Sequence, residues 1–165
     1  METKARDWQG WLREHTSRLL LFARAQTRCE ADAEDVLQDA LVECWRRSKG
    51  ATPELPLVYA TLRRRAIDLA RSTDRRVARE ETVVADIETV CWFDDALTKA
   101  EAASILDRAM KKMPEKFREV MLLKIWGGLT FVQVAETLDI PMNTAASRYR
   151  YGLEFLRKDT ELSQS

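Results

Sequence analysis

The chain has 165 residues, with 27 basic and 27 acidic side chains, one histidine, five glycines and four prolines. Hydrophobic residues make up 45% of it, which is enough to form the core of one domain or of two small ones. So few glycines and prolines exclude an all-β chain with many tight turns and favour a helical protein. No apolar stretch approaches the roughly 20 residues of a membrane span, and no secretory signal is visible. Three cysteines without a CxxC pair suggest neither a disulfide framework nor a zinc site, so we expect a reducing, cytoplasmic setting.

Three amphipathic helices are predicted in the first part of the chain, which we assign to a domain over residues 1–80. The first spans about residues 5–28, and its apolar stripe includes His15, which we interpret as a packed structural residue because no cysteine, serine or acid constellation surrounds it. The second is capped by Asp32. The third follows Pro53 and Pro56, and its apolar periodicity is lost from about Ser72. The predicted buried stripes contain Trp8, Trp11, Leu12, Leu19, Phe22 and Ala23 in the first helix, Val36, Leu37, Ala40, Leu41, Cys44 and Trp45 in the second, and Val58, Tyr59, Leu62, Ala66 and Leu69 in the third.

Charge is balanced overall but not along the chain. Residues 56–80 hold seven arginines and three acids, whereas residues 81–107 hold seven acids and a single lysine. Separated patches act separately because the Debye length is only about 8 Å at physiological salt. The first domain therefore offers an acidic face that suits a basic protein and an arginine-rich face that suits a nucleic-acid backbone. The acidic stretch shows no sustained period and is interpreted as a linker over residues 81–98, although Trp92 and Phe93 within it are apolar enough to dock on a domain or to stack on bases, as Tyr59 also could.

The second domain, over residues 99–160, has the signature of a helix-turn-helix. Pro114 begins one helix, Gly127 and Gly128 end it, and Thr130 caps a short helix that is followed by a turn and a last helix. In such a motif the second helix enters the major groove, and its outward side chains reach base edges and phosphates. The same positions could instead form the solvated face of an ordinary helical hairpin. The outward residues are Asn143, Thr144, Ser147, Arg148, Arg150 and Tyr151.

The order of these features resembles the extracytoplasmic-function (ECF) sigma factors of the sigma-70 family over most of the chain. Residues 32–39 (DAEDVLQD), followed by Trp45, resemble the region 2 helix that docks on the clamp helices of the RNA polymerase β′ subunit. Residues 62–68 (LRRRAID) resemble the segment that reads and opens the −10 element, with residues 71–79 in the loop that holds a flipped base. Residues 113–120, 129–130, 134–138 and 143–148 resemble region 4, which reads −35 DNA and binds the β flap tip.

The resemblance implies an all-α protein of two small helical domains that acts as a transcription initiation factor, directing core RNA polymerase to promoters and assisting strand opening. It implies no enzyme activity, no cofactor and no metal, and an anti-sigma factor is a candidate partner beside polymerase and promoter DNA. Polymerase contacts are expected from Asp35, Gln38, Asp39 and Glu43. Contacts with −10 DNA are expected from Tyr59, Arg63, Arg64, Arg71, Arg75 and Arg76, and contacts with −35 DNA from Asn143, Thr144, Ser147, Arg148, Arg150 and Tyr151.

The chain departs from the family pattern at four positions. Arg64 stands where members often carry asparagine in the −10 pocket, and Leu57 replaces a frequent tryptophan. Ala146 replaces a frequent lysine or arginine and Asn143 the usual glycine, so we expect one contact fewer there, partly replaced by Arg148 and Arg150.

The sequence is also compatible with two other function classes. The main alternative is a conventional helix-turn-helix regulator whose first domain dimerises or senses a ligand and which binds its DNA site alone. An enzyme is a more distant alternative, since one histidine and scattered acids provide no convergent general acid and base.

Overall fold

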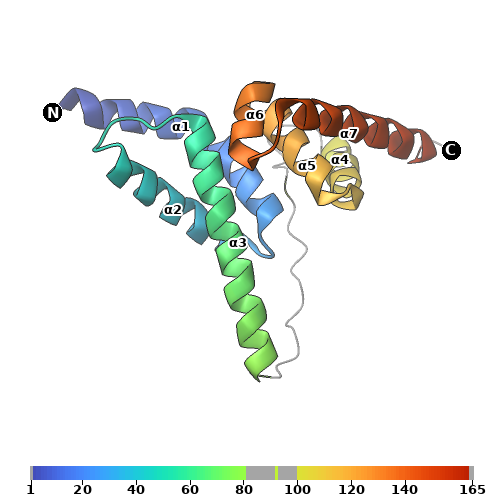
Figure 1. Ribbon diagram of the computed structural model, residues 1–165, viewed down its shortest axis with the longest axis horizontal. Coiled ribbons are helices and arrows are strands. Elements are labelled where there is room, and N and C mark those ends of the chain that lie inside the picture. Colours follow the sequence, from blue (N-terminus) through green and yellow to red (C-terminus); the bar gives the residue numbers. More distant parts are fainter. Residues whose placement is uncertain (1, 81–91, 93–99, 164–165) are drawn as a thin grey trace. The chain divides into compact units, whose positions relative to one another are not determined.

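The computed structural model describes residues 2–80, residue 92 and residues 100–163 (Figure 1). All regular secondary structure in these residues is helical, which confirms the predicted all-α class. The chain divides into two compact units, Met1–Val90 and Cys91–Ser165. Of the predicted linker, residues 81–98, only Trp92 belongs to the described residues. Within the described ranges, no helix has the length and apolar content needed to cross a membrane.

The described part of the first unit contains three helices, α1 (Glu2–Gln26), α2 (Glu30–Arg47) and α3 (Leu55–Glu80). Their apolar stripes face one another and form the core, as the spacing of the apolar residues predicts. The buried side chains include Leu19, Phe22 and Ala23 from α1, Val36, Leu37, Ala40 and Cys44 from α2, and Val58, Tyr59, Leu62 and Ala66 from α3. Trp11, Leu12, Leu41 and Leu69 are only half-buried at the margins of this core, and the assignment of Trp45 is wrong, because its side chain is 42% exposed.

The start of α2 also differs from the prediction. The N-cap is Cys29, whose Sγ accepts a hydrogen bond from the backbone N–H of Asp32 at 3.4 Å. Asp32 is the third residue of the helix rather than its cap. Its carboxylate and that of Glu30 still favour this end, because the first turn of a helix carries the positive end of the helix dipole.

The third helix is longer than expected. Residues 71–79, which were assigned to a loop, lie within α3. None of these nine residues is buried, so the apolar periodicity that marks a helix is missing from this part of the sequence. The helix continues because arginine and alanine favour it and no glycine or proline interrupts it. The arginines of this segment therefore project from a continuous helix rather than from a loop.

The described part of the second unit contains α4 (Ala100–Lys112), α5 (Glu115–Met121), a π-helical turn η1 (Leu122–Trp126), α6 (Phe131–Leu138) and α7 (Met142–Ser163). Thr130 caps α6 as predicted, in a capping box: its Oγ1 accepts from the N–H of Gln133, and the Gln133 side chain accepts from the N–H of Thr130. Asp139, at φ 54, ends α6 in the left-handed conformation and leads into the turn before α7.

Two small residues set α7 against the core of the second unit. Ala145 is fully buried beneath the first turn of α7. Seven residues on, which is about two turns, a Cβ at Gly152 would lie 2.7 Å from the Cγ of Met121, so only glycine allows α7 to approach α5 this closely. With this face fixed inward, the polar residues of the first turns of α7 face outward.

Candidate nucleic-acid interface

The exposed face of α3 carries a row of arginines. Arg64, Arg71 and Arg75 are spaced by seven and four residues, which places them on one side of the helix, over about 16 Å at 1.5 Å per residue. A hollow of about 550 Å³ next to this row is lined by Asp68, Arg71, Asp74 and Arg75. Asp68 and Asp74 lie among these arginines, and Asp74 pairs with Arg28 at 2.9 Å, so the row presents spaced cations rather than an unbroken positive surface. Cations spaced along one helix face suit the phosphates of a nucleic-acid backbone.

Three of the residues expected at −10 DNA lie elsewhere on α3. Arg76 is exposed beside the row and Arg63 is half-buried at a position about 100° around the helix from Arg64. Tyr59 is 1% exposed, with its ring edge-on to Phe22 at 5.3 Å between centroids, and burial raises its pKa to about 12. A side chain so enclosed has no face to offer a base, so the DNA contact expected of Tyr59 is replaced by a place in the core.

The polymerase-binding residues expected on α2 separate into two groups. Asp35, Gln38 and Asp39 are exposed on one face of the helix. Glu43 is not available in the same way, because its side chain is only 17% exposed and is surrounded by arginines. The Oε1 atom of Glu43 lies 2.6 Å from Nη2 of Arg64 and 3.0 Å from Nη2 of Arg47, and its Oε2 lies 2.9 Å from Nε of Arg65. The hydrogen bond from Arg64 holds the pKa of the Glu43 carboxyl below its ordinary value, although burial acts in the opposite direction.

The structure adds two apolar side chains to the acidic face. Val42 is 43% exposed and Trp45 is 42% exposed, and their spacing from Gln38 and Asp39 puts them on the same side of α2. The ring of Trp45 rests against Trp8 of α1, with centroids 4.7 Å apart. Trp8 in turn donates from its indole N–H to the carbonyl of Gly50 at 3.1 Å. The spacing of apolar residues predicts that Trp45 is in the core. The position of α1 shows instead that Trp8 is the buried member of this ring pair.

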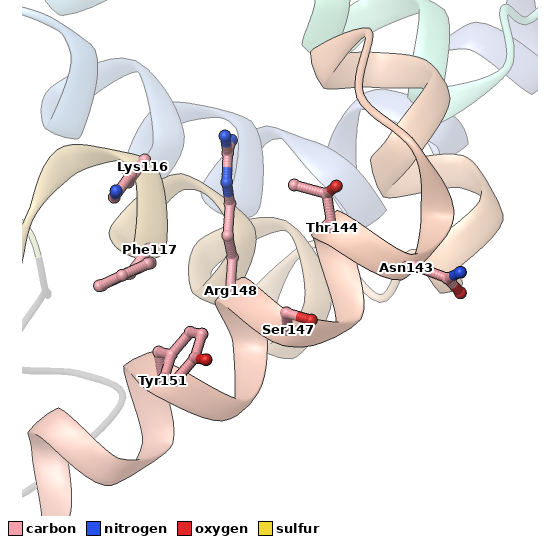
Figure 2. A pocket seen from close by; sticks show the side chains of 7 residues that line it. All are labelled: Lys116, Phe117, Asn143, Thr144, Ser147, Arg148 and Tyr151. Atoms are coloured by element: carbon pink, nitrogen blue, oxygen red, sulfur yellow. The ribbon is translucent and has the colours of Figure 1, made fainter.

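The outward face of α7 forms the second basic surface. A hollow of about 350 Å³ is lined by Asn143, Thr144, Ser147, Arg148 and Tyr151 from α7 and by Lys116 and Phe117 from α5 (Figure 2). The rings of Phe117 and Tyr151 face each other at 5.8 Å between centroids, which closes one end of the hollow. Five of the six residues expected at −35 DNA thus come together.

The sixth residue and two missed ones complete this surface. Arg150 is exposed beside the hollow, with its guanidinium 5.4 Å from the centre of the Tyr151 ring. Lys116 and Phe117 were not predicted to lie here, although both belong to the region 4-like segment 113–120. No pattern in the sequence indicates that the start of α5 lies beside α7, because their proximity depends on the packing of Gly152 against Met121.

Trp92 is part of the second unit. It is 7% exposed, its backbone N–H donates to the carboxylate of Asp107 at 2.8 Å, and the guanidinium of Arg118 lies 4.9 Å from its ring centre. Burial lowers the pKa of Arg118 from its usual value. The expectation that Trp92 docks on a domain is confirmed, and its burial leaves no face for base stacking. Phe93 lies outside the described residues.

The single histidine and the potential metal ligands of the described residues do not gather at these surfaces. His15 packs against Trp11, with ring centroids 5.0 Å apart, and no group of three or more potential metal ligands gathers in the ranges that the structure covers.

Two family models match the chain and together cover most of it. Sigma-70 region 2 matches residues 11–76, and Sigma-70 region 4 matches residues 103–156. The ECF RNA polymerase sigma factor SigK of Mycolicibacterium vanbaalenii is 29% identical over 133 residues, which cover 76% of this chain and 67% of that protein. SigL of Mycobacterium tuberculosis is 28% identical over 153 residues, which cover 87% of this chain and 83% of SigL. The chain is an ECF sigma factor of the sigma-70 family.

Solved structures agree with this sigma factor in fold. The sigma factor RpoE from Bartonella quintana, in complex with the anti-sigma factor NepR, superimposes with a TM-score of 0.77 over 94% of this chain and 98% of RpoE, at 18% identity. CnrH, in complex with the cytosolic domain of CnrY, gives a TM-score of 0.64 at 20% identity, over 96% of this chain and 90% of CnrH. The match of both regions identifies a transcription initiation factor rather than a conventional helix-turn-helix regulator.

Proposed function

We propose a division of labour between the faces of this sigma factor. The exposed face of α2, with Asp35, Gln38 and Asp39 around Val42 and Trp45, docks on core RNA polymerase. The apolar pair provides the buried centre of the contact and the acids provide the charged rim that sets orientation and partner choice. The acidic residues suit a basic surface such as that of the β′ clamp helices.

The arginine row of α3 is proposed to hold the non-template strand at the −10 element. Opening a duplex costs about 1.4 kcal/mol per base step in lost stacking. Cations spaced along one helix offset part of this cost, because they bind the phosphates of the separated strand. Arg64, Arg71 and Arg75 form the row, with Arg63 and Arg76 beside it.

The hollow between α5 and α7 is proposed to grip duplex DNA at the −35 element. Asn143, Thr144, Ser147 and Arg148 have the hydrogen-bonding groups that read base edges in the major groove, while Lys116 and Arg150 are placed for phosphates. The ring pair of Phe117 and Tyr151 offers an apolar surface that suits a thymine methyl group. The second unit is also proposed to contact the β flap.

The observation that carries the proposal is the presence of two separate cationic surfaces, on α3 and on α7, in a chain that also exposes an acidic and apolar face on α2. A function at promoters implies that the chain acts in the cytoplasm. It also implies that polymerase, and not this chain, catalyses RNA synthesis. An inhibitory partner of the anti-sigma type belongs to the proposal as well, because RpoE was solved with such a protein bound.

Run-off transcription with purified core polymerase and a randomised promoter library tests this function. We expect transcripts from a defined promoter class only when chain and core are both present, and specific promoter binding only by the pair. Tight and specific DNA binding by the chain alone, with no transcript when core is added, would contradict the proposal.

A further inference from the structure

Glu43 occupies an unusual place between the two proposed faces of the first unit. It lies on α2, four residues after Asp39, which belongs to the exposed face proposed to bind polymerase. Its carboxylate, however, points to the arginines of α3. Both of its oxygens are engaged, by Arg64 and Arg47 on one side and by Arg65 on the other. An acid enclosed in this way has little capacity left for a contact with polymerase.

We propose that Glu43 is a positioning residue for DNA, which holds Arg64 and Arg65 in place so that they receive a backbone phosphate of the −10 region. This inference rests on the proposed function of the α3 face. It replaces the expected polymerase contact of Glu43 with a role in promoter engagement, and it adds Arg65 to the residues of the DNA face.

The charge of the cluster points to an anionic ligand. Three guanidinium groups surround one carboxylate, and the only other carboxylate close to them among the ion pairs described here is that of Asp39, 3.9 Å from Arg65. The cluster therefore retains a net positive charge. Each guanidinium has five N–H donors in a fixed fork, so one hydrogen bond to Glu43 leaves donors for a phosphate. All three head groups remain partly exposed, with side-chain exposures of 54% for Arg47, 49% for Arg64 and 38% for Arg65, so they are open to a ligand from solvent.

Without the carboxylate, the arrangement would not persist. Arg47, Arg64 and Arg65 carry like charges that repel one another, and long arginine side chains have many rotamers to occupy when nothing holds them. The carboxylate of Glu43 offsets the repulsion and fixes the two α3 guanidinium groups before DNA arrives. A site ordered in advance binds more tightly because less side-chain freedom is lost on binding.

Two other roles for Glu43 predict different results. If Glu43 masked Arg64 by competing with phosphate, its removal would strengthen DNA binding. A mere change of net charge would also strengthen it, because one negative charge is lost next to a polyanion. If Glu43 contacted polymerase, its removal would weaken binding to core. Only the positioning role predicts weaker DNA binding with unchanged core binding.

The test measures binding of the reconstituted holoenzyme to a fork-junction promoter whose −10 non-template strand is single-stranded. The variants are Glu43→Gln, Glu43→Asp, Arg64→Gln and the Glu43→Gln/Arg64→Gln double variant. Glu34→Gln is the matched control, since it removes the same charge from an exposed position of the same helix. Core affinity and thermal unfolding are measured for every variant.

We expect Arg64→Gln to weaken fork binding about tenfold, the effect of losing one charge-assisted hydrogen bond to a phosphate. Glu43→Gln should weaken it about threefold or more, whereas Glu34→Gln leaves it unchanged or slightly stronger. Glu43→Asp should recover part of the loss, because it keeps the charge. The double variant should lose less than the product of the two single losses, since Glu43 acts in part through Arg64, and what it loses beyond Arg64→Gln reports the positioning of Arg65.

A scan with methylphosphonates, which neutralise one phosphate at a time, locates the ligand. Neutralising one −10 phosphate should weaken binding of the unmodified protein, and it should weaken binding of Arg64→Gln or Glu43→Gln less. Equal or tighter fork binding by Glu43→Gln, additive losses in the double variant, or a loss of core affinity would each overturn the inference. If the unmodified protein fails to support transcription with core, the proposed function itself fails, and the two failures are thus distinguished.

Discussion

Arg148→Ala is the most direct perturbation of the proposed −35 surface. The side chain lies in the hollow between α5 and α7, between the cation of Lys116 and the hydroxyl of Ser147 (Figure 2). An arginine that makes two hydrogen bonds to a guanine edge contributes about 1–3 kcal/mol of discrimination, so we expect a loss of roughly 5- to 150-fold in affinity for the preferred promoter. The loss should depend on the base at one position of the −35 element.

Holoenzyme binding to a panel of promoters with single −35 substitutions measures this effect, at two or more salt concentrations. Arg157→Ala is the matched control, because Arg157 is exposed on the same helix nine residues later, outside the lining of the hollow. Lys116→Ala provides a contrast. A phosphate contact predicts a similar loss on every promoter and a shallower salt dependence, by about one unit of slope.

The reasoning about Arg148 fails if promoter choice is unchanged in Arg148→Ala. A uniform loss with a shallower salt slope would assign Arg148 to a phosphate instead of a base. A changed unfolding temperature would show that the side chain acts on the fold, although its partly exposed position predicts no such change.

Three further predictions concern the first unit. Trp45→Ala should weaken core binding by about 2 kcal/mol or more in a titration of labelled core, as expected for an aromatic anchor, and an unchanged affinity would remove Trp45 from the interface. Asp35→Arg combined with Asp39→Arg should also weaken core binding while the helical circular-dichroism signal is retained, because both side chains are exposed; loss of that signal would contradict their placement. Tyr59, whose pKa is raised from 10 to about 12, contributes stability that is fully present below pH 10 and is lost as the pH rises through 12. Alkaline unfolding should show a loss of about 2–3 kcal/mol over this window that is absent in Tyr59→Phe, and identical curves for the two proteins would refute the burial argument.

The sequence by itself determined the helices, their apolar faces and the family. Periodic apolar residues such as Val36, Leu37 and Ala40 are buried wherever a helix meets a core, so their spacing is sufficient to predict the packed faces. Caps are equally local, which is why Thr130 was predicted correctly. The outward residues of α7 follow from the same period, since the position of Ala145 on the inner face fixes theirs.

The tertiary structure alone decided which polar and aromatic side chains are free to bind. Tyr59 and Trp45 both lie at positions that fit an apolar stripe. Tyr59 is buried against Phe22 of α1, whereas Trp45 is exposed because Trp8 of α1 occupies the buried position next to it. Glu43 and Arg64 are 21 residues apart, and no local pattern shows that α2 and α3 bring them within hydrogen-bonding distance. Local spacing determines which face of a helix a residue occupies, but only the packing of other helices determines what that face meets.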